Sequence, residues 1–107
     1  MELKELLKFI EIEHERLKKY YGGYDDQEKR ILARTVKLTE ELGELCNGVL
    51  AHNSLQRKQK LDNYDKENLP EEFADVIITT LLLAKAMNID IEKALEKKTE
   101  KVNKRYE

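Results

Sequence analysis

Residues 73–84, which read FADVIITTLLLA, form an apolar stretch near the middle of the chain. Drawn as a helix, this stretch is hydrophobic on nearly every face, and a helix of that kind must be covered by its neighbours. The whole chain has only one proline and four glycines, which leaves little room for a turn-rich β fold. We therefore expect an all-α protein in which this segment is the buried helix.

Apolar residues that recur at spacings of three and four indicate four helices. Asp25 or Asp26 is a plausible N-cap for the second helix and Asp90 for the fourth, because a carboxylate accepts hydrogen bonds from the free N–H groups of a first turn. Pro70 suits the first turn of the third helix. The expected helices cover about residues 2–20, from 25 or 26 to about 51, about 70–87 and 91–106. Together they predict a four-helix bundle-like subunit.

Length and charge narrow the possible classes of protein. The chain has 107 residues, enough for one modest core, so we expect a single helical domain over residues 1–107. Its 20 basic and 22 acidic residues leave a net charge of −2, which predicts binding to neither nucleic acid nor membranes. Cys46 is the only cysteine and cannot form an internal disulfide. We expect a cytoplasmic protein.

The apolar third helix also bears on assembly. The other three helices are amphipathic, and a chain of 107 residues cannot easily surround a whole helix with three partners. The uncovered part would be a larger apolar patch than monomers usually tolerate, and a two-fold partner is the commonest way to cover it. We therefore expect a homo-oligomer, either a dimer or a tetramer.

Two acidic pairs occur at a spacing of three, which places the members of each pair on one helix face. Glu41 and Glu44 lie beside the apolar stripe of the second helix, and Glu72 and Asp75 belong to the third. Asp75 has apolar neighbours, among which a lone carboxylate is costly unless it is paired or bound to a metal. Antiparallel packing of the two helices would bring the four carboxylates together. Oxygen ligands without histidine or thiolate favour Mg²⁺, or Mn²⁺, over zinc.

Structural explanations stay open for several of these residues. Acidic pairs at this spacing are common by chance in so acidic a chain, and Lys37 could satisfy Asp75 as an ion-pair partner. Gly43 and Gly48 each cost a helix about 1 kcal/mol relative to alanine, which indicates a close approach at these positions. His14 has no second histidine or cysteine at ligand spacing, so we expect it to be structural.

The segment from residue 53 to residue 69 is polar and long for a connection between helices. It is expected to be either a functional loop or partly ordered. Its basic residues are more often part of a solvated loop, but they could also close over phosphates. They include Arg57, Lys58 and Lys60.

The acidic pattern resembles that of a known family. Residues 40–44 (EELGE) followed by residues 72–75 (EFAD) are similar to the EExxE and ExxD signature of the MazG-like, all-α nucleoside triphosphate pyrophosphohydrolases. Residues 94–106 resemble the last helix of that family, where basic residues and an asparagine approach the nucleotide. The resemblance covers about residues 27–106, and it departs from the family in the long basic spacer between the two acidic pairs.

This resemblance implies an oligomeric, all-α NTP pyrophosphatase that cleaves nucleoside triphosphates, deoxynucleotides included, to a monophosphate and pyrophosphate with Mg²⁺. Glu41 or Glu44 would act catalytically by orienting or deprotonating the attacking water. The implied metal ligands are Glu41, Glu44, Glu72 and Asp75, and the implied substrate-binding residues are Lys37, Lys98 and Asn103.

Two alternatives remain. The first is a relative specific for phosphoribosyl-ATP or for a single nucleotide such as dUTP. The second is a non-catalytic helical interaction module, whose acidic faces bind a basic partner and which would not bind Mg²⁺. A ferritin-like di-iron bundle is disfavoured because the sequence has no Glu-x-x-His motif.

Overall fold

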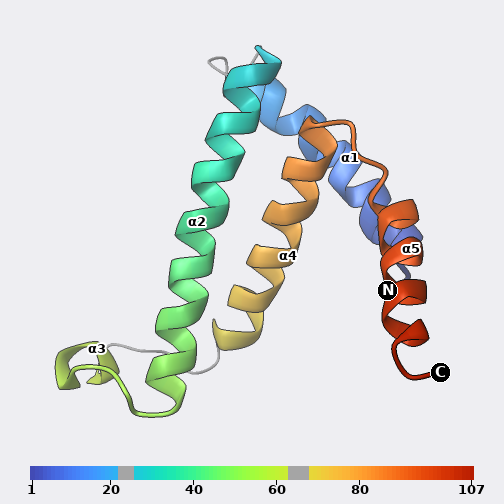
Figure 1. Ribbon diagram of the computed structural model, residues 1–107. Coiled ribbons are helices and arrows are strands. Elements are labelled where there is room, and N and C mark those ends of the chain that lie inside the picture. Colours follow the sequence, from blue (N-terminus) through green and yellow to red (C-terminus); the bar gives the residue numbers. More distant parts are fainter. Residues whose placement is uncertain (22–25, 63–67) are drawn as a thin grey trace.

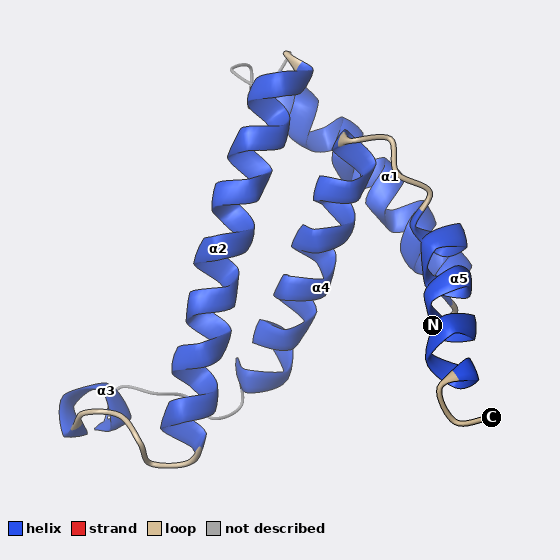
Figure 2. Ribbon diagram, viewed as in Figure 1, coloured by secondary structure: helices blue, strands red, loops and turns tan. Residues whose placement is uncertain are grey.

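The computed structural model describes residues 1–21, 26–62 and 68–107. Five helices and no strand are present in these ranges (Figures 1 and 2). They are α1 (Leu3–Tyr20), α2 (Gln27–His52), α3 (Lys58–Asp62), α4 (Leu69–Ala86) and α5 (Ile91–Lys104). The prediction of an all-α fold with four long helices is confirmed. No helix of the described part is long and apolar enough to cross a membrane.

The helices begin where their capping residues predict. Asp26 accepts a hydrogen bond from the backbone N–H of Glu28 at 2.8 Å, and Asp90 accepts one from the N–H of Lys93 at 3.1 Å. Pro70 occupies the first turn of α4. The alternative N-cap Asp25 lies outside the described residues. Cap chemistry thus identified the starts of three helices to within about one residue.

Two long helices form the centre of the molecule. The α2 and α4 helices lie side by side and antiparallel, and α1 packs against α4 (Figure 1). The central apolar cluster is small: Ile10, Leu81 and Leu82 are buried, and they pack against partly buried residues of α1, α4 and α5. The antiparallel packing that the acidic pairs require is therefore present.

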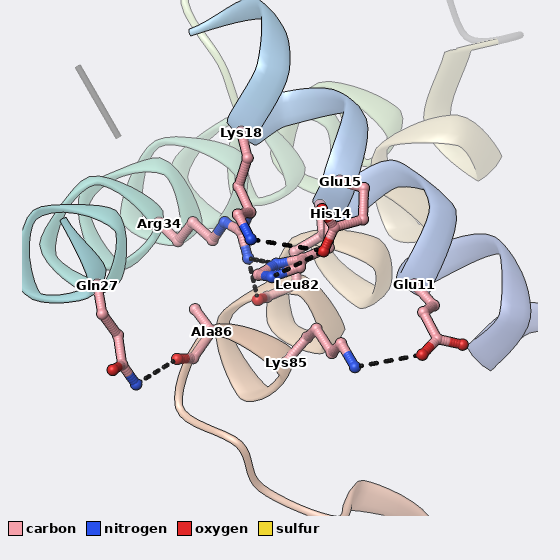
Figure 3. Close-up of polar contacts among 9 residues, drawn as sticks. All are labelled: Glu11, His14, Glu15, Lys18, Gln27, Arg34, Leu82, Lys85 and Ala86. Atoms are coloured by element: carbon pink, nitrogen blue, oxygen red, sulfur yellow. Dashed lines mark hydrogen bonds and ion pairs between the residues drawn. The ribbon is translucent and has the colours of Figure 1, made fainter. Parts of the chain in front are cut away.

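A buried polar contact joins the three central helices close to this core (Figure 3). One guanidinium nitrogen of Arg34 on α2 donates to the backbone carbonyl of Leu82 on α4 at 2.7 Å. The same nitrogen lies 2.8 Å from Nδ1 of His14 on α1. Burial, followed by the charge of Arg34, lowers the pKa of His14 to about 4. His14 is structural, as expected, and its neutral ring accepts the hydrogen bond.

The single chain is open rather than compact. Its radius of gyration is 16.8 Å, whereas a compact domain of this length has about 13 Å. Its accessible surface is 8431 Å², against about 6,200 Å² expected for a folded monomer of this mass. Phe73 and Ile77 on α4 are 49% and 53% exposed. The single chain thus leaves part of α4 uncovered, as its length predicts, because α1 and α2 cover only part of the circumference of this helix.

One helix was not expected at all. The α3 helix has five residues and extends from the lower end of α2 (Figure 1). The turn that precedes it is fixed by a Schellman motif, in which the N–H of Leu55 bonds to the carbonyl of Leu50 and the N–H of Ser54 to that of Ala51. Ser54 has the left-handed φ of 58° that this motif requires.

Candidate active site

The four predicted carboxylates influence one another across α2 and α4. Burial raises the pKa of Glu72, and the nearby carboxylates of Glu44, Asp75 and Glu41 raise it further. Neighbouring negative charges have this effect because each disfavours ionisation of the others. The fold has thus brought two acidic pairs, 28 or more positions apart in the sequence, into one electrostatic cluster.

Gly48 allows this cluster to form. A Cβ atom at this position would overlap Oε2 of Glu72 and would lie 3.1 Å from Cδ1 of Leu69. The carboxylate of Glu72 therefore rests against the bare backbone of α2. The close approach expected at Gly48 is confirmed, but at Gly43 it is wrong, because no atom lies within 4 Å of a Cβ added there.

Glu41 and Glu72, and not Asp75, are the shielded carboxylates of this site. Oε2 of Glu72 is buried without a hydrogen-bond partner, whereas Asp75 is exposed. The expectation that Asp75 points into the core is wrong for the single chain, because its neighbours Phe73, Ala74 and Ile77 are exposed as well. A buried carboxylate oxygen without a partner is costly to desolvate, and here that oxygen belongs to Glu72.

Lys37 pairs with other acids than the one expected. Its ammonium lies 3.1 Å from Oε1 of Glu41 and 3.5 Å from Oε2 of Glu40. The hydrogen bond to the buried Glu41 raises the pKa of Lys37. No ion pair between Lys37 and Asp75 occurs in the described part of the chain, so the proposed structural partner of Asp75 is a partner of Glu41.

The donor set fits a hard divalent cation. All four candidate ligands are carboxylates, and Mg²⁺ and Mn²⁺ prefer oxygen ligands. The unpartnered oxygen of Glu72 and its raised pKa indicate a deficit of positive charge at this point. As the described side chains lie, no three of them stand close enough together to hold a metal ion. The chemistry of the residues therefore fits a hard cation, whereas the described side chains do not converge closely enough to form its ligand set.

A hollow of about 470 Å³ opens beside the acidic cluster. Its volume is within the range of small-molecule sites, about 300–1,000 Å³. Glu44 and Glu72 line one part of it, while Arg57 and Lys60 from α3 and its preceding turn line another. The same hollow is thus lined by carboxylates, which can bind a cation, and by basic side chains, which can bind an anion.

The residues expected on the last helix do not reach this hollow. Lys98 and Asn103 are exposed on α5, and Figure 1 places α5 on the other side of α4 from α2. The single chain brings together Glu41, Glu44, Glu72, Asp75 and Lys37, but not these two residues.

Three site or scaffold residues were not singled out from the sequence. Arg34 lies between Ile31 and Leu38 on the apolar stripe of α2, and a charged residue in such a stripe is a signal that a buried polar contact exists. Asn47 follows Glu44 at a spacing of three and also lines the hollow, so helix periodicity could have identified it. Gln56 lines the hollow too, but nothing in the sequence indicates this.

Comparison with known proteins agrees with this geometry. Residues 27–107 match the model of the MazG nucleotide pyrophosphohydrolase domain. YpjD of Bacillus subtilis (strain 168), an uncharacterized protein, is 32% identical over 99 residues, which span 92% of this chain and 85% of that protein. No solved structure matches the chain significantly. The protein is an all-α protein with paired carboxylates on two antiparallel helices, and it belongs to the MazG nucleotide pyrophosphohydrolase family.

Proposed function

We propose that the protein is a Mg²⁺-dependent pyrophosphohydrolase that cleaves nucleoside triphosphates to a nucleoside monophosphate and pyrophosphate. Membership of the MazG family supports this class of reaction. The observation that carries the proposal is the state of Glu72. Its buried oxygen has no partner, it rests against Gly48, and three carboxylates raise its pKa. Such a cluster is unfavourable in an apoprotein and is explained by a cation that it holds during function.

The proposed roles follow from charge and position. Glu41, Glu44, Glu72 and Asp75 hold the metal, and Glu41 or Glu44 orients or deprotonates the attacking water. A bound divalent cation would neutralise phosphate charge and lower the pKa of a water. No covalent nucleophile is required in this proposal, in which water attacks the triphosphate directly. Lys37, Lys98 and Asn103 are proposed to contact the substrate.

Assembly is part of this proposal. The accessible surface exceeds that of a compact monomer by roughly 2,200 Å², which is on the scale of the area that stable homodimers bury. Several large apolar side chains of the two central helices are exposed, namely Val36, Leu42, Phe73 and Ile77. We propose that a second copy covers them in a homodimer or tetramer. Since Lys98 and Asn103 lie away from the acidic cluster of their own chain, any contact with substrate would be with a nucleotide bound to another subunit.

The test is product identification. The protein is incubated with Mg²⁺ and a panel of canonical and modified triphosphates, phosphoribosyl-ATP and dUTP included, and the products are separated by ion-exchange chromatography. The proposal predicts monophosphate and pyrophosphate in equal amounts, and no turnover when the metal is chelated. Diphosphate and orthophosphate as main products would contradict it. A complete lack of both turnover and Mg²⁺ binding would favour the interaction module.

A further inference from the structure

We propose that Gln56, Arg57 and Lys60 form a substrate-binding arm, in which Arg57 and Lys60 contact phosphate oxygens of the nucleotide in the hollow. This inference rests on the proposed function, since it assumes that a triphosphate occupies the site. It assigns a role to the long basic spacer, which is the part of the sequence that departs from the family pattern.

The arm is attached to the acidic helix by side-chain hydrogen bonds. Oδ1 of Asn47 on α2 accepts from Nε2 of Gln56 at 2.6 Å and from Nζ of Lys60 at 3.4 Å. Asn47 lies one turn beyond Glu44 on the face that lines the hollow. These contacts hold the arm against the helix that carries half of the acidic cluster, so the arm is part of the wall of the hollow.

The backbone gives the arm its direction. The Schellman motif at Ser54 ends α2 and reverses the chain. A hydrogen bond from the N–H of Lys60 to the carbonyl of Arg57, at 2.9 Å, begins the helical turn that follows. This reversal of the chain therefore brings Arg57 and Lys60 back toward α2.

The negative charge of the proposed substrate explains why basic side chains and carboxylates line the same hollow. A triphosphate that has bound one divalent cation is still an anion, so its remaining oxygens need other partners. In the described part of the chain, neither Arg57 nor Lys60 forms an ion pair with a carboxylate. A guanidinium can bind two phosphate oxygens at once, and an ammonium acts as a point charge. Both groups line the hollow that Glu44 and Glu72 also line.

Lys58 provides a matched comparison. It belongs to the same short helix and is exposed, but unlike its neighbours it does not line the hollow. Removal of its charge changes the overall charge of the segment by the same amount as removal of the charge of Lys60. Any difference between the two variants therefore reports position and not net charge.

The experiment measures binding and turnover on the full chain. Arg57→Gln, Lys60→Gln, the double variant and the control Lys58→Gln are compared with wild type, as is the conservative variant Lys60→Arg. Calorimetry gives the affinity for inorganic tripolyphosphate with Mg²⁺ and for a triphosphate analogue whose α,β bond cannot be hydrolysed. Steady-state kinetics give KM and kcat. Circular dichroism verifies that each variant is folded.

If the arm binds phosphate, each Gln variant at Arg57 or Lys60 should bind the triphosphate about tenfold more weakly and have a KM about tenfold higher. This effect is on the order of what one charged hydrogen bond contributes. We also expect a kcat within about threefold of wild type, no change for Lys58→Gln and near-wild-type binding for Lys60→Arg. Unchanged affinity and KM in the double variant would overturn the inference while the proposed function stands. If wild type binds triphosphate without hydrolysing it, the proposed reaction fails, and the arm is then judged by the binding data alone. If wild type neither binds nor hydrolyses it, both fail.

Discussion

Individual side chains determine where charge is tolerated in this molecule. Glu72 places a carboxylate oxygen in a buried position with three acidic neighbours, and Arg34 places a guanidinium in the core. The two cases differ in their partners. Arg34 is satisfied by His14 and by the carbonyl of Leu82, which makes it part of the scaffold. Glu72 has no such partner, which is why it belongs to the proposed site.

The buried histidine predicts how stability depends on pH. The pKa of His14 is about 4 in the folded chain and 6.5 in its ordinary state, so the unfolded chain takes up a proton first as pH falls. Stability is therefore fully present above about pH 6.5 and is lost progressively down to about pH 4. A His14→Gln variant keeps an acceptor for Arg34 but does not titrate.

Urea unfolding of both proteins between pH 4 and pH 7 tests this prediction. Wild type is expected to lose up to roughly 3 kcal/mol more than His14→Gln over this interval, because one pKa unit corresponds to about 1.4 kcal/mol. Carboxylates titrate equally in both proteins and cancel in the difference. Parallel stability curves would show that the histidine is not held neutral by burial and by Arg34.

At the scale of the helix, a substitution at Gly48 should affect stability and turnover differently. Alanine favours a helix by about 1 kcal/mol over glycine, but a Cβ here would meet the carboxylate of Glu72. The side chain of Glu72 can move away, so Gly48→Ala should be no less stable than wild type. Its turnover should fall by on the order of tenfold to a hundredfold, because a proposed metal ligand is displaced.

Gly43→Ala is the matched control for this prediction. No atom lies within 4 Å of a Cβ at that position, so the variant should gain about 1 kcal/mol and keep its turnover. Thermal unfolding and initial rates measured on both variants decide the matter. Equal turnover in Gly48→Ala and Gly43→Ala would show that the contact between α2 and Glu72 has no role in the site.

The helices also show which structural features could be predicted from the sequence. Cap residues such as Asp26 and Asp90 predicted helix starts correctly, because capping is a local interaction. The α3 helix was not predicted, because five residues are too short for a periodic pattern, and the turn before it uses Ser54 where glycine is the usual signal. The hydrogen bonds of Asn47 to Gln56 and Lys60 depend on that turn, so they could not be predicted from the sequence either.

The same limit explains the error at Asp75. Hydrophobicity around the whole circumference of α4 indicates that the helix is covered, but not which part is covered by its own chain. Within the single chain, Leu81 and Leu82 in the second half of α4 are buried, while Phe73 and Ile77 in the first half are not. Antiparallel packing and a spacing of three nevertheless bring the two acidic pairs near enough for Glu44, Asp75 and Glu41 to raise the pKa of Glu72, in addition to the effect of its burial.

For the whole molecule, the exposed apolar surface predicts self-association. A stable assembly would make unfolding depend on concentration, since dissociation accompanies it. The midpoint of thermal unfolding should rise by several degrees between about 1 and 100 μM, and light scattering should give at least twice the mass of one chain. A folded species of 12.6 kDa at micromolar concentration would contradict this prediction.

The central claim is that the acidic cluster is a hydrolytic metal site, and Asp75→Asn tests it most directly. The substitution removes one charge from an exposed side chain, so the fold should persist, and the metal-free protein should be at least as stable because carboxylate repulsion decreases. We expect Mg²⁺-dependent release of pyrophosphate to fall by more than about a hundredfold in the folded variant. Undiminished release of pyrophosphate by folded Asp75→Asn would contradict the central claim.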